Sequence, residues 1–263
     1  MKRLVILVTL LAVAAMLLAA CAPAAPANRL EAVKAAGKLV VGTSPDYPPF
    51  ESKDASGNFI GFDVELMNAV AEKMGVTVEW TDMPFDSLVA AVQTGKLDAS
   101  ISAFNYDEER AKQVDFTQAY YTAMDGFLVA DTFAGSITKA EDIAQYKVGV
   151  QSGTVQADWI DENLVQPGLL ATENLLQYER VDQAALDVKA GRIDVLMGDN
   201  IPLAALAESL GGLKMAFEDT VASGEFMLIL PKEEPELQAE LDKAITALKE
   251  EGFVDELAQK WFK

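Results

Sequence analysis

The 263-residue chain contains no histidine, and its only cysteine is Cys21. Catalysis of the Ser-His-Asp or Cys-His kind therefore has no base, and zinc sites of the usual type have no ligand set. A single cysteine also excludes an internal disulfide. Any chemistry would have to use carboxylates, lysines or tyrosines, and we expect neither a metal nor a cofactor.

Basic residues are scarce, because 21 Lys and Arg oppose 41 Asp and Glu and the formal net charge is −20. Removing Lys2 and Arg3 with the leader described next would take this charge from −20 to −22. So acidic a surface repels nucleic-acid phosphates and anionic lipid headgroups. We expect no nucleic acid as a partner, whereas the net charge says nothing about a small ligand.

Residues 1–20 have the layout of a secretory signal peptide, with a basic start, an uncharged apolar block and small residues before Cys21. Leu-Ala-Ala-Cys at 18–21 resembles the bacterial lipobox. The alternative is a chance cysteine after a membrane anchor, but the block is short for a stable span. We expect an acylated Cys21 that holds an extracytoplasmic protein at the membrane, periplasmic side or cell surface. Residues 21–36 then form the lipidated cysteine and a flexible tether, since 22–29 are mostly Ala and Pro.

After the tether, short apolar strands alternate with amphipathic helices, which is typical of βαβ units in a mainly parallel α/β fold. The pattern predicts strands at 38–43, 76–80 and 97–102. Asp63 is a plausible N-cap for the helix after the first strand. A second helix is expected from Asp86 to Thr94, closed by Gly95 in a left-handed conformation.

This scheme is repeated, because residues 88–103 can be laid over 184–199, with Gly95 and Gly191 96 residues apart. Residues 147–154 likewise correspond to 38–45. Helix, glycine and strand recur in every α/β protein, so convergence is the alternative. Two matches in the same order nevertheless favour two related lobes.

The strands at 126–130 and 225–230 flank the second repeat, and we interpret them as the connections between the lobes. Helices expected at 236–250 and 253–262 then return to the first lobe. We therefore assign 37–124 and 223–263 to lobe I and 125–222 to an inserted lobe II. Two connecting strands would allow a hinge, and a cleft between lobes is where a small ligand is enclosed.

Polar and aromatic residues follow the predicted strands, where ligands collect in open α/β sheets. They are Ser44, Asp46, Tyr47, Phe85, Ser102, Ala103, Asn105, Arg110, Gln151, Ser152, Gly153, Thr154, Gln156 and Asp199. This set holds one fixed cation, a well-placed anion, two aromatic faces and several hydroxyls or amides. An amino acid zwitterion requires that combination, since a guanidinium binds a carboxylate and a carboxylate receives an ammonium.

Each of these residues also has a purely structural interpretation. Arg110 may be read as a surface arginine paired with Glu108 or Glu109, and Asp199 as the N-cap of the next helix. Thr154 belongs to a Ser-Gly-Thr helix start of a common type, although such starts attract anions. Tyr47 and Phe85 lie in proline-containing loops rather than on a periodic apolar face, which favours a cleft over a core position.

The chain from about Leu39 to Phe262 resembles the bacterial extracellular solute-binding proteins of the polar amino acid uptake family, the receptors of ABC importers. The resemblance is carried by the ordered set VGTSPDYPPFESKDASGNFIGFDVELMNAVAEKMGV, FDSLVAAVQTGKLDASISAFNYDEERAKQVDFTQAYY, KVGVQSGT, AGRIDVLMGD and the final KEEPELQAELDKAITALKEEGFVDELAQKWF. It implies a periplasmic-binding-protein-like fold, in which two α/β lobes joined by a two-stranded hinge close on a ligand. The implied partners are a free amino acid and the membrane permease of an ABC importer, with the receptor acting as a monomer.

The resemblance also implies roles for individual residues. Arg110 would hold the ligand α-carboxylate, Asp199 the α-ammonium, and Tyr47 and Phe85 would sandwich the side chain, with the Thr154 hydroxyl assisting at the carboxylate. The chain departs from the family at Ala103 and Asn105, where Gly or Ser and Ser or Thr are common; backbone donation from residue 103 would survive. Members that bind cationic amino acids often carry an acid at position 44, so Ser44 favours a neutral polar ligand unless Asp46 faces the cleft.

Two other functions compete with this interpretation. Cyclohexadienyl dehydratases resemble the same family, so a secreted enzyme on this scaffold is one alternative. It needs a carboxylate with a tuned pKa, and no spare buried carboxylate beyond Asp46 and Asp199 is evident in the sequence. A sensor without a transport role is the other alternative. We expect a binding protein rather than an enzyme, and Pro48 and Pro49 to stiffen the loop that presents Tyr47.

Overall fold

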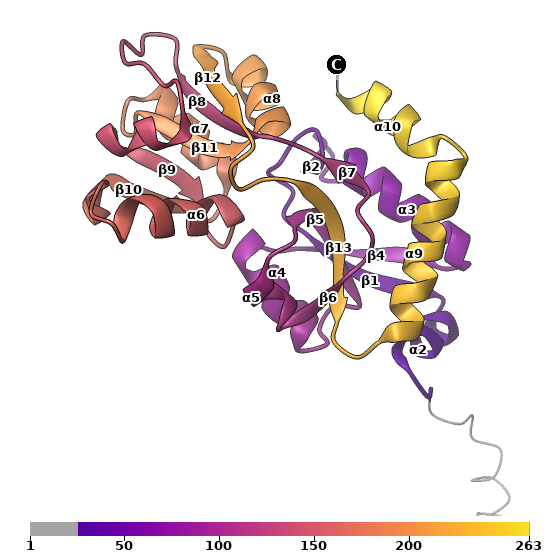
Figure 1. Cartoon of the computed structure of the whole chain (residues 1–263). Coiled ribbons are helices and arrows are strands. Elements are labelled where there is room, and N and C mark those ends of the chain that lie inside the picture. The colour runs from indigo at the N-terminus through magenta and orange to yellow at the C-terminus, as the bar shows by residue number, and fades with distance from the viewer. Residues whose placement is uncertain (1–25, 263) are drawn as a thin grey trace, which may run out of the picture.

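The computed structural model describes residues 26–262, which form two α/β lobes (Figure 1). The sheet of lobe I has the order β4-β1-β5-β13-β6, with β7 beside β13. Its strands are β1 (Lys38–Thr43), β4 (Thr77–Asp82), β5 (Ala99–Asn105), β6 (Val114–Phe116), β7 (Tyr121–Thr122) and β13 (Glu225–Pro231). The strands predicted at 38–43, 76–80 and 97–102 are therefore present, the last two displaced by one to three residues at their ends.

Helices cover both faces of this sheet. They are α2 (Arg29–Ala36), α3 (Phe62–Met74), α4 (Phe85–Gln93), α5 (Glu108–Ala111), α9 (Pro235–Glu250) and α10 (Phe253–Trp261), and a small hairpin consists of β2 (Ser52–Lys53) and β3 (Phe59–Ile60). In β5, Ile101 belongs to the core under α3 and Phe104 to the core under α4. Side chains alternate between the two faces of a strand, which is why all seven residues of β5 are buried.

Lobe II has the strand order β10-β9-β11-β8-β12. Its strands are β8 (Asp125–Ala130), β9 (Val148–Gln151), β10 (Leu175–Tyr178), β11 (Val195–Asp199) and β12 (Leu213–Asp219). Its helices are η1 (Ala140–Gln145), α6 (Val155–Ile160), η2 (Asp161–Val165), η3 (Thr172–Asn174), α7 (Val181–Lys189) and α8 (Asn200–Leu210).

Two segments run between the lobes side by side (Figure 1). One joins β7 to β8 and the other joins β12 to β13, and the Ala123 amide donates a hydrogen bond to the Gly224 carbonyl at 3.1 Å. The strands expected to be the connections, 126–130 and 225–230, instead belong to the sheets of lobe II and lobe I. The crossing segments themselves are the short stretches on either side of them, which gives the fold its two-stranded hinge.

The two lobes use the same device at the start of corresponding strands. In lobe I, the Asp98 side chain accepts a hydrogen bond from the Val40 amide at 2.8 Å. The Asp98 amide donates a second hydrogen bond to the Val40 carbonyl. In lobe II, Asp194 does the same with Lys147, whose amide donates at 2.9 Å. This agreement supports the predicted repeat, and it makes Asp98 and Asp194 strand-edge residues rather than ligands.

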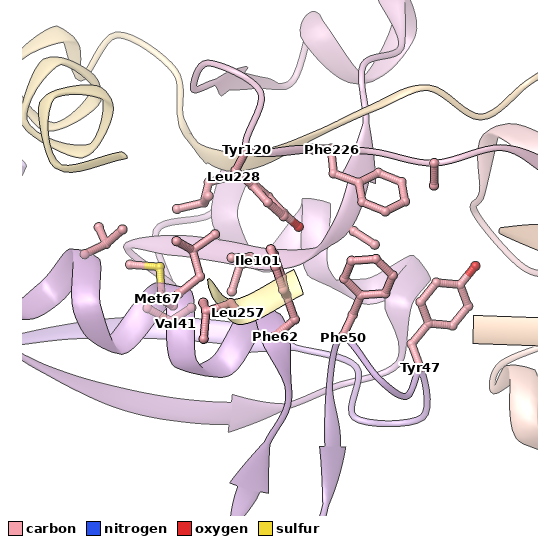
Figure 2. Close-up of a cluster of buried hydrophobic side chains, with 14 of the residues drawn as sticks. Val41, Tyr47, Phe50, Phe62, Met67, Ile101, Tyr120, Phe226, Leu228 and Leu257 are labelled. Carbon is pink, nitrogen blue, oxygen red and sulfur yellow. The ribbon is translucent and has the colours of Figure 1, made fainter. Parts of the chain in front are cut away.

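Phe50 lies at the centre of the lobe I core (Figure 2). It is fully buried, with its ring 5.3 Å from that of Phe226 and 4.9 Å from that of Phe262. Because these partners come from β13 and the chain end, the Tyr47–Phe50 loop is fixed to lobe I at one side. Truncating such a side chain typically costs about 3–5 kcal/mol of unfolding free energy.

Two predictions for the N-terminal part of the chain are wrong, the extent of the tether and the N-cap of α3. The tether expected over residues 21–36 overlaps α2, which lies against the lobe through ion pairs from Arg29 to Asp98 and from Lys34 to Glu240. Asp63 is not an N-cap, because α3 begins after Gly61, which has φ 133°. A Cβ at Gly61 would lie 2.1 Å from the Phe50 carbonyl oxygen, so only glycine fits there.

The predicted signal peptide and Cys21 lie outside residues 26–262. Within that range, no helix combines the length and the apolar character needed to cross a bilayer.

Candidate functional site

A cavity lies between the lobes, and twelve of the fourteen strand-end residues named from the sequence line it, whereas Ser152 and Gly153 do not. The twelve are Ser44, Asp46, Tyr47, Phe85, Ser102, Ala103, Asn105, Arg110, Gln151, Thr154, Gln156 and Asp199, joined by Glu51 and Val155. The cavity has an empty volume of about 330 Å³, with the open solvent at its mouth included. The ends of β1 and β5 contribute one wall, and the ends of β9 and β11 contribute the other, because strand ends of a parallel arrangement meet at one edge of the sheet.

Arg110 is a buried cation in the wall that lobe I contributes. Arg110 lies in α5, the helix capped by Asp107. The Asp107 side chain accepts a hydrogen bond from the Arg110 amide at 2.7 Å. The Arg110 guanidinium donates to the Asn105 carbonyl at 2.7 Å and, across the cleft, to the Gly153 carbonyl at 3.0 Å. Among residues 26–262 no carboxylate forms an ion pair with it, so the pairing with Glu108 or Glu109 considered above is absent.

The surroundings of Arg110 favour a bound anion. Phe85 and Phe104 flank its guanidinium at 5.8 and 5.4 Å, and burial lowers the pKa of Arg110, partly opposed by the charges of Asp107 and Asp158. Beside it, the Asn105 side-chain nitrogen is a buried donor without a hydrogen-bond partner in the described residues. Within the described chain, a guanidinium without a carboxylate partner and an unpartnered amide nitrogen therefore line the same cavity.

Asp199 is a buried anion in the opposite wall, with 4% of its surface exposed. It occupies the N-cap position of α8, but its side chain makes no capping hydrogen bond. The carboxylate instead accepts hydrogen bonds from Tyr47 at 2.8 Å, from Gln156 at 3.0 Å and from Ser223. No Lys or Arg of residues 26–262 pairs with it, and burial raises its pKa to about 7.

Tyr47 reaches across the cleft from lobe I. Its hydroxyl donates to the Asp199 carboxylate and accepts the Asp199 amide at 3.0 Å, and Figure 2 shows this hydroxyl pointing away from the Phe50 core. Burial, reinforced by the charge of Asp199, raises the pKa of Tyr47 well above its usual value, so the phenol stays protonated. Phe85 lines the cavity and stacks on Phe104 with ring centres 4.8 Å apart.

Asp46 faces the cleft, which answers the question that the sequence left open. One carboxylate oxygen accepts from the Ser44 hydroxyl at 2.6 Å. The other accepts from lobe II, from the Val181 amide at 2.6 Å and the Gln151 side chain at 3.2 Å. Burial raises the pKa of Asp46, against the hydrogen bonds from Ser44 and Val181 and the charge of Arg180, which lower it.

Two expected donors are already engaged. The Ala103 amide, expected to remain available to a ligand, donates to the Asp63 carboxylate at 3.0 Å because Ala103 has a positive φ of 49° that turns its peptide inward. Thr154 caps α6: its hydroxyl accepts the Ala157 amide at 3.2 Å and donates to the Gln151 carbonyl at 2.8 Å. Ser102 donates to the Glu51 carboxylate at 2.5 Å.

Sequence reasoning missed a pair of buried carboxyl groups, Glu51 and Asp63. Both are fully buried, and Glu51 lines the cavity with one oxygen that has no partner in residues 26–262. Burial and the neighbouring Asp63 raise the pKa of Glu51 well above its usual value, and burial raises that of Asp63 to about 6. The expectation that no further buried carboxylate is present was therefore wrong. No periodic signal marks Glu51, because it follows Phe50 in an irregular loop.

Residues 39–263 match the model of the family described as bacterial extracellular solute-binding proteins, family 3. The chain is 31% identical over 226 residues to the arginine-binding extracellular protein ArtP of Bacillus subtilis (strain 168), covering 86% of each protein. It is 30% identical over 234 residues to the lysine/arginine/ornithine-binding periplasmic protein of Escherichia coli (strain K12), covering 84% of this chain and 86% of the relative.

Solved structures are similar over most of the chain. An ancestral arginine-binding protein bound to arginine aligns with a TM-score of 0.80 and 33% identity, over 86% of this chain and 99% of the other. An ancestral arginine-binding protein bound to glutamine aligns with a TM-score of 0.78 and 33% identity, over 86% of this chain and 98% of the other. An ancestral amino acid-binding protein described as a precursor of cyclohexadienyl dehydratase aligns with a TM-score of 0.78 and 32% identity, over 90% of this chain and 100% of the other.

Proposed function

This chain belongs to the bacterial extracellular solute-binding proteins of family 3, and we propose that it captures a free amino acid between its lobes for a membrane permease. The permease is that of an ABC importer, and the receptor acts as a monomer. We further propose that the amino acid has an uncharged polar side chain. ArtP and the Escherichia coli relative are named for basic amino acids, whereas the glutamine-bound structure has a neutral ligand on a similar scaffold.

One observation carries the proposal: a buried cation and a buried anion line the same cavity, and neither has a partner of opposite charge in residues 26–262. An unpaired buried charge costs several kcal/mol unless it is compensated. The α-carboxylate of an amino acid would compensate Arg110 and the α-ammonium would compensate Asp199. Asn105 supplies a further donor for the carboxylate.

The other lining residues have supporting roles in this proposal. Tyr47 and Phe85 enclose the ligand side chain between aromatic faces, and Tyr47 also holds the Asp199 carboxylate by its hydroxyl. Gln156 orients Asp199, while Ser102 orients Glu51. The backbone amides at the start of α6 complete the carboxylate end, and Thr154 caps that helix.

We expect the melting temperature of the full chain, purified in mild detergent, to rise when the right amino acid is added. A ligand at a thousand times its dissociation constant stabilises the folded state by about 4 kcal/mol. A thermal-shift screen of the common amino acids, followed by calorimetry on each hit, measures this. Absence of any shift across the panel would contradict the proposal.

A dehydratase-like enzyme is the second candidate, favoured by one feature, the buried carboxyl group of Glu51, which lines the cavity next to Asp63. A carboxyl group with a raised pKa can act as a general acid. The similar solved structure described as a precursor of cyclohexadienyl dehydratase suggests which substrates to test. Consumption of prephenate or arogenate by the purified protein, lost in Glu51→Gln, would establish this function in place of transport.

We propose that Cys21 carries the membrane anchor, because it follows the lipobox-like Leu-Ala-Ala. An acyl chain contributes about 0.8 kcal/mol of membrane affinity per buried CH₂, and stable anchoring takes more than one chain or signal. With a surface as acidic as this one, electrostatic attraction to lipid headgroups cannot be the second signal.

Cys21→Ser should therefore move the protein from the membrane fraction to the soluble extracytoplasmic fraction. Immunoblots of fractionated cells expressing both proteins measure the change. An uncleaved leader and an unacylated Cys21 in the wild-type protein would identify residues 4–18 as a plain membrane anchor instead.

A further inference from the structure

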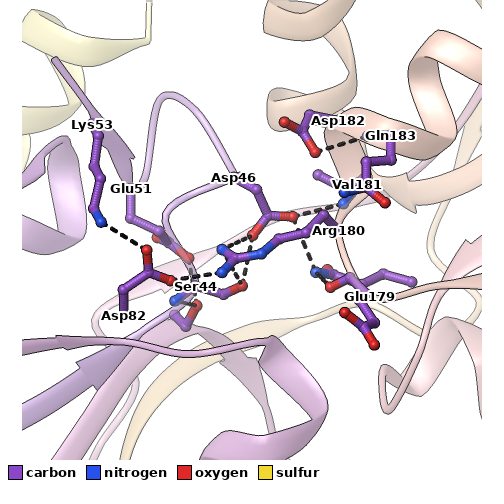
Figure 3. Close-up of polar contacts among 12 residues, drawn as sticks. Ser44, Asp46, Glu51, Lys53, Asp82, Glu179, Arg180, Val181, Asp182 and Gln183 are labelled. Atoms are coloured by element: carbon purple, nitrogen blue, oxygen red, sulfur yellow. Dashed lines mark hydrogen bonds and ion pairs between the residues drawn. The ribbon is translucent and has the colours of Figure 1, made fainter. Parts of the chain in front are cut away.

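A guanidinium from lobe II lies against the end of the cavity formed by Ser44 and Asp46 (Figure 3). It belongs to Arg180, which precedes α7. One of its nitrogens lies 3.4 Å from Asp46 Oδ1 and 3.4 Å from Ser44 Oγ. The other donates to Asp82 at 2.6 Å. Arg180 thus bridges two carboxylates of the opposite lobe.

Asp46 has no hydrogen-bonding capacity left for a ligand. Oδ1 accepts from Ser44 and Arg180, and Oδ2 accepts from Val181 and Gln151. A carboxylate offers about four lone-pair sites, and all of these are occupied. The Val181 amide also belongs to the first turn of α7, whose dipole favours a negative charge.

The charges in this cluster balance without a ligand. Asp46 and Asp82 supply two negative charges, and Arg180 and Lys53 supply two positive ones, with Lys53 donating to Asp82 at 2.7 Å. The side chain of Asp46 is only 3% exposed and that of Arg180 23%. An additional cation at this end of the cavity would therefore meet a neutral cluster and the nearby Arg180 guanidinium.

We infer that Arg180 is a specificity-determining residue that takes the place of a basic ligand side chain and so selects amino acids with uncharged side chains. This rests on the proposed function, since it concerns the side chain of an amino acid held by Arg110 and Asp199. A basic side chain would have to displace Arg180 from Asp46 or lie next to a like charge, and such repulsion is an established route to specificity. Asp46 then supports neutral specificity even though it faces the cleft.

Arg180→Gln tests this directly. Calorimetry on the full chain in detergent would compare the wild type, this variant and Arg192→Gln, an exposed lobe II arginine that pairs with Asp187. For the wild type we expect glutamine to bind at least tenfold more tightly than arginine or lysine. Arg180→Gln should shift the ratio of the two dissociation constants toward the basic amino acids by tenfold or more, because Asp46 is left uncompensated. Arg192→Gln should leave the ratio unchanged.

The ratio isolates specificity from any general weakening of closure, since loss of the bridge between the lobes acts on every ligand equally. Adding Asp46→Asn to Arg180→Gln should restore the preference for glutamine. Tight arginine binding by the wild type, or an unchanged ratio in Arg180→Gln, would overturn the inference while leaving amino acid capture intact. A wild type that binds no amino acid would overturn the proposed function and the inference with it.

Discussion

Arg110→Met is expected to abolish measurable amino acid binding while the protein remains folded. The substitution keeps an unbranched apolar stem beside the stacked rings of Phe85 and Phe104 but removes the guanidinium that we assign to the ligand carboxylate. Removing one partner of a buried, hydrogen-bonded charge pair costs about 2–5 kcal/mol, which corresponds to about 30- to 4,000-fold in dissociation constant. Calorimetry with the best ligand of the wild type measures the loss.

Two further measurements make this result specific. Without ligand, the variant should unfold at the wild-type temperature or higher, because a buried guanidinium without a carboxylate partner destabilises the closed form. Arg110→Lys keeps the charge but not the two-pronged geometry, so it should recover only part of the affinity. A variant that fails to fold would show that Arg110 is structural, through its bonds to Asn105 and Gly153.

Asp199→Asn is expected to weaken binding by a hundredfold or more and to reduce its pH dependence. Burial raises the pKa of Asp199 to about 7 in the ligand-free protein, so below that pH the carboxyl holds a proton that ammonium binding must expel. The wild-type affinity should therefore fall by up to tenfold per pH unit as the pH drops from about 7 to 5, and level off above 7. The asparagine variant should lack the part of this fall that Asp199 causes, as measured by calorimetry over the same range.

Two further titratable groups lie close to the cavity: Asp63, whose pKa is about 6, and Glu51, whose pKa is raised by burial and by the charge of Asp63. They are present in both proteins, so the difference between the two profiles belongs to Asp199. A wild-type profile that stays flat, or a variant that binds normally, would remove Asp199 from the ammonium site.

The raised pKa of Asp199 affects ligand affinity and the stability of the ligand-free protein in opposite directions as the pH rises. The usual pKa of an aspartate is 3.8, and that of folded Asp199 is about 7, so the folded state holds more protons between these values. Unfolding free energy therefore decreases through this site as the pH rises from about 4 to 7. Ligand binding opposes that loss, which couples occupancy to stability.

Much of the site was predictable because its residues follow strands. Apolar runs with helix caps and glycines between them mark where β1, β5, β9 and β11 end, and parallel strands bring those ends to one edge. That is why Tyr47, Arg110 and Asp199 could be placed together although their positions in the chain are far apart. The wrong helix start at Asp63 has a local cause: a carboxylate in the first turn resembles a cap, but the close approach of Phe50 requires glycine two residues earlier.

The sequence alone determined the α/β class, the doubled scheme, the family resemblance and the chemistry available at the strand ends. These depend on short-range patterns of apolar residues, caps and turns, which each segment carries by itself. Only the tertiary structure decided that Asp46 is matched by Arg180, that Glu51 and Asp63 are buried together, and that Arg110 and Asp199 have no charged partner in the described chain. The reason is physical: burial and pairing depend on how two lobes meet, and residues 134 apart, such as Asp46 and Arg180, carry no local signal of that contact.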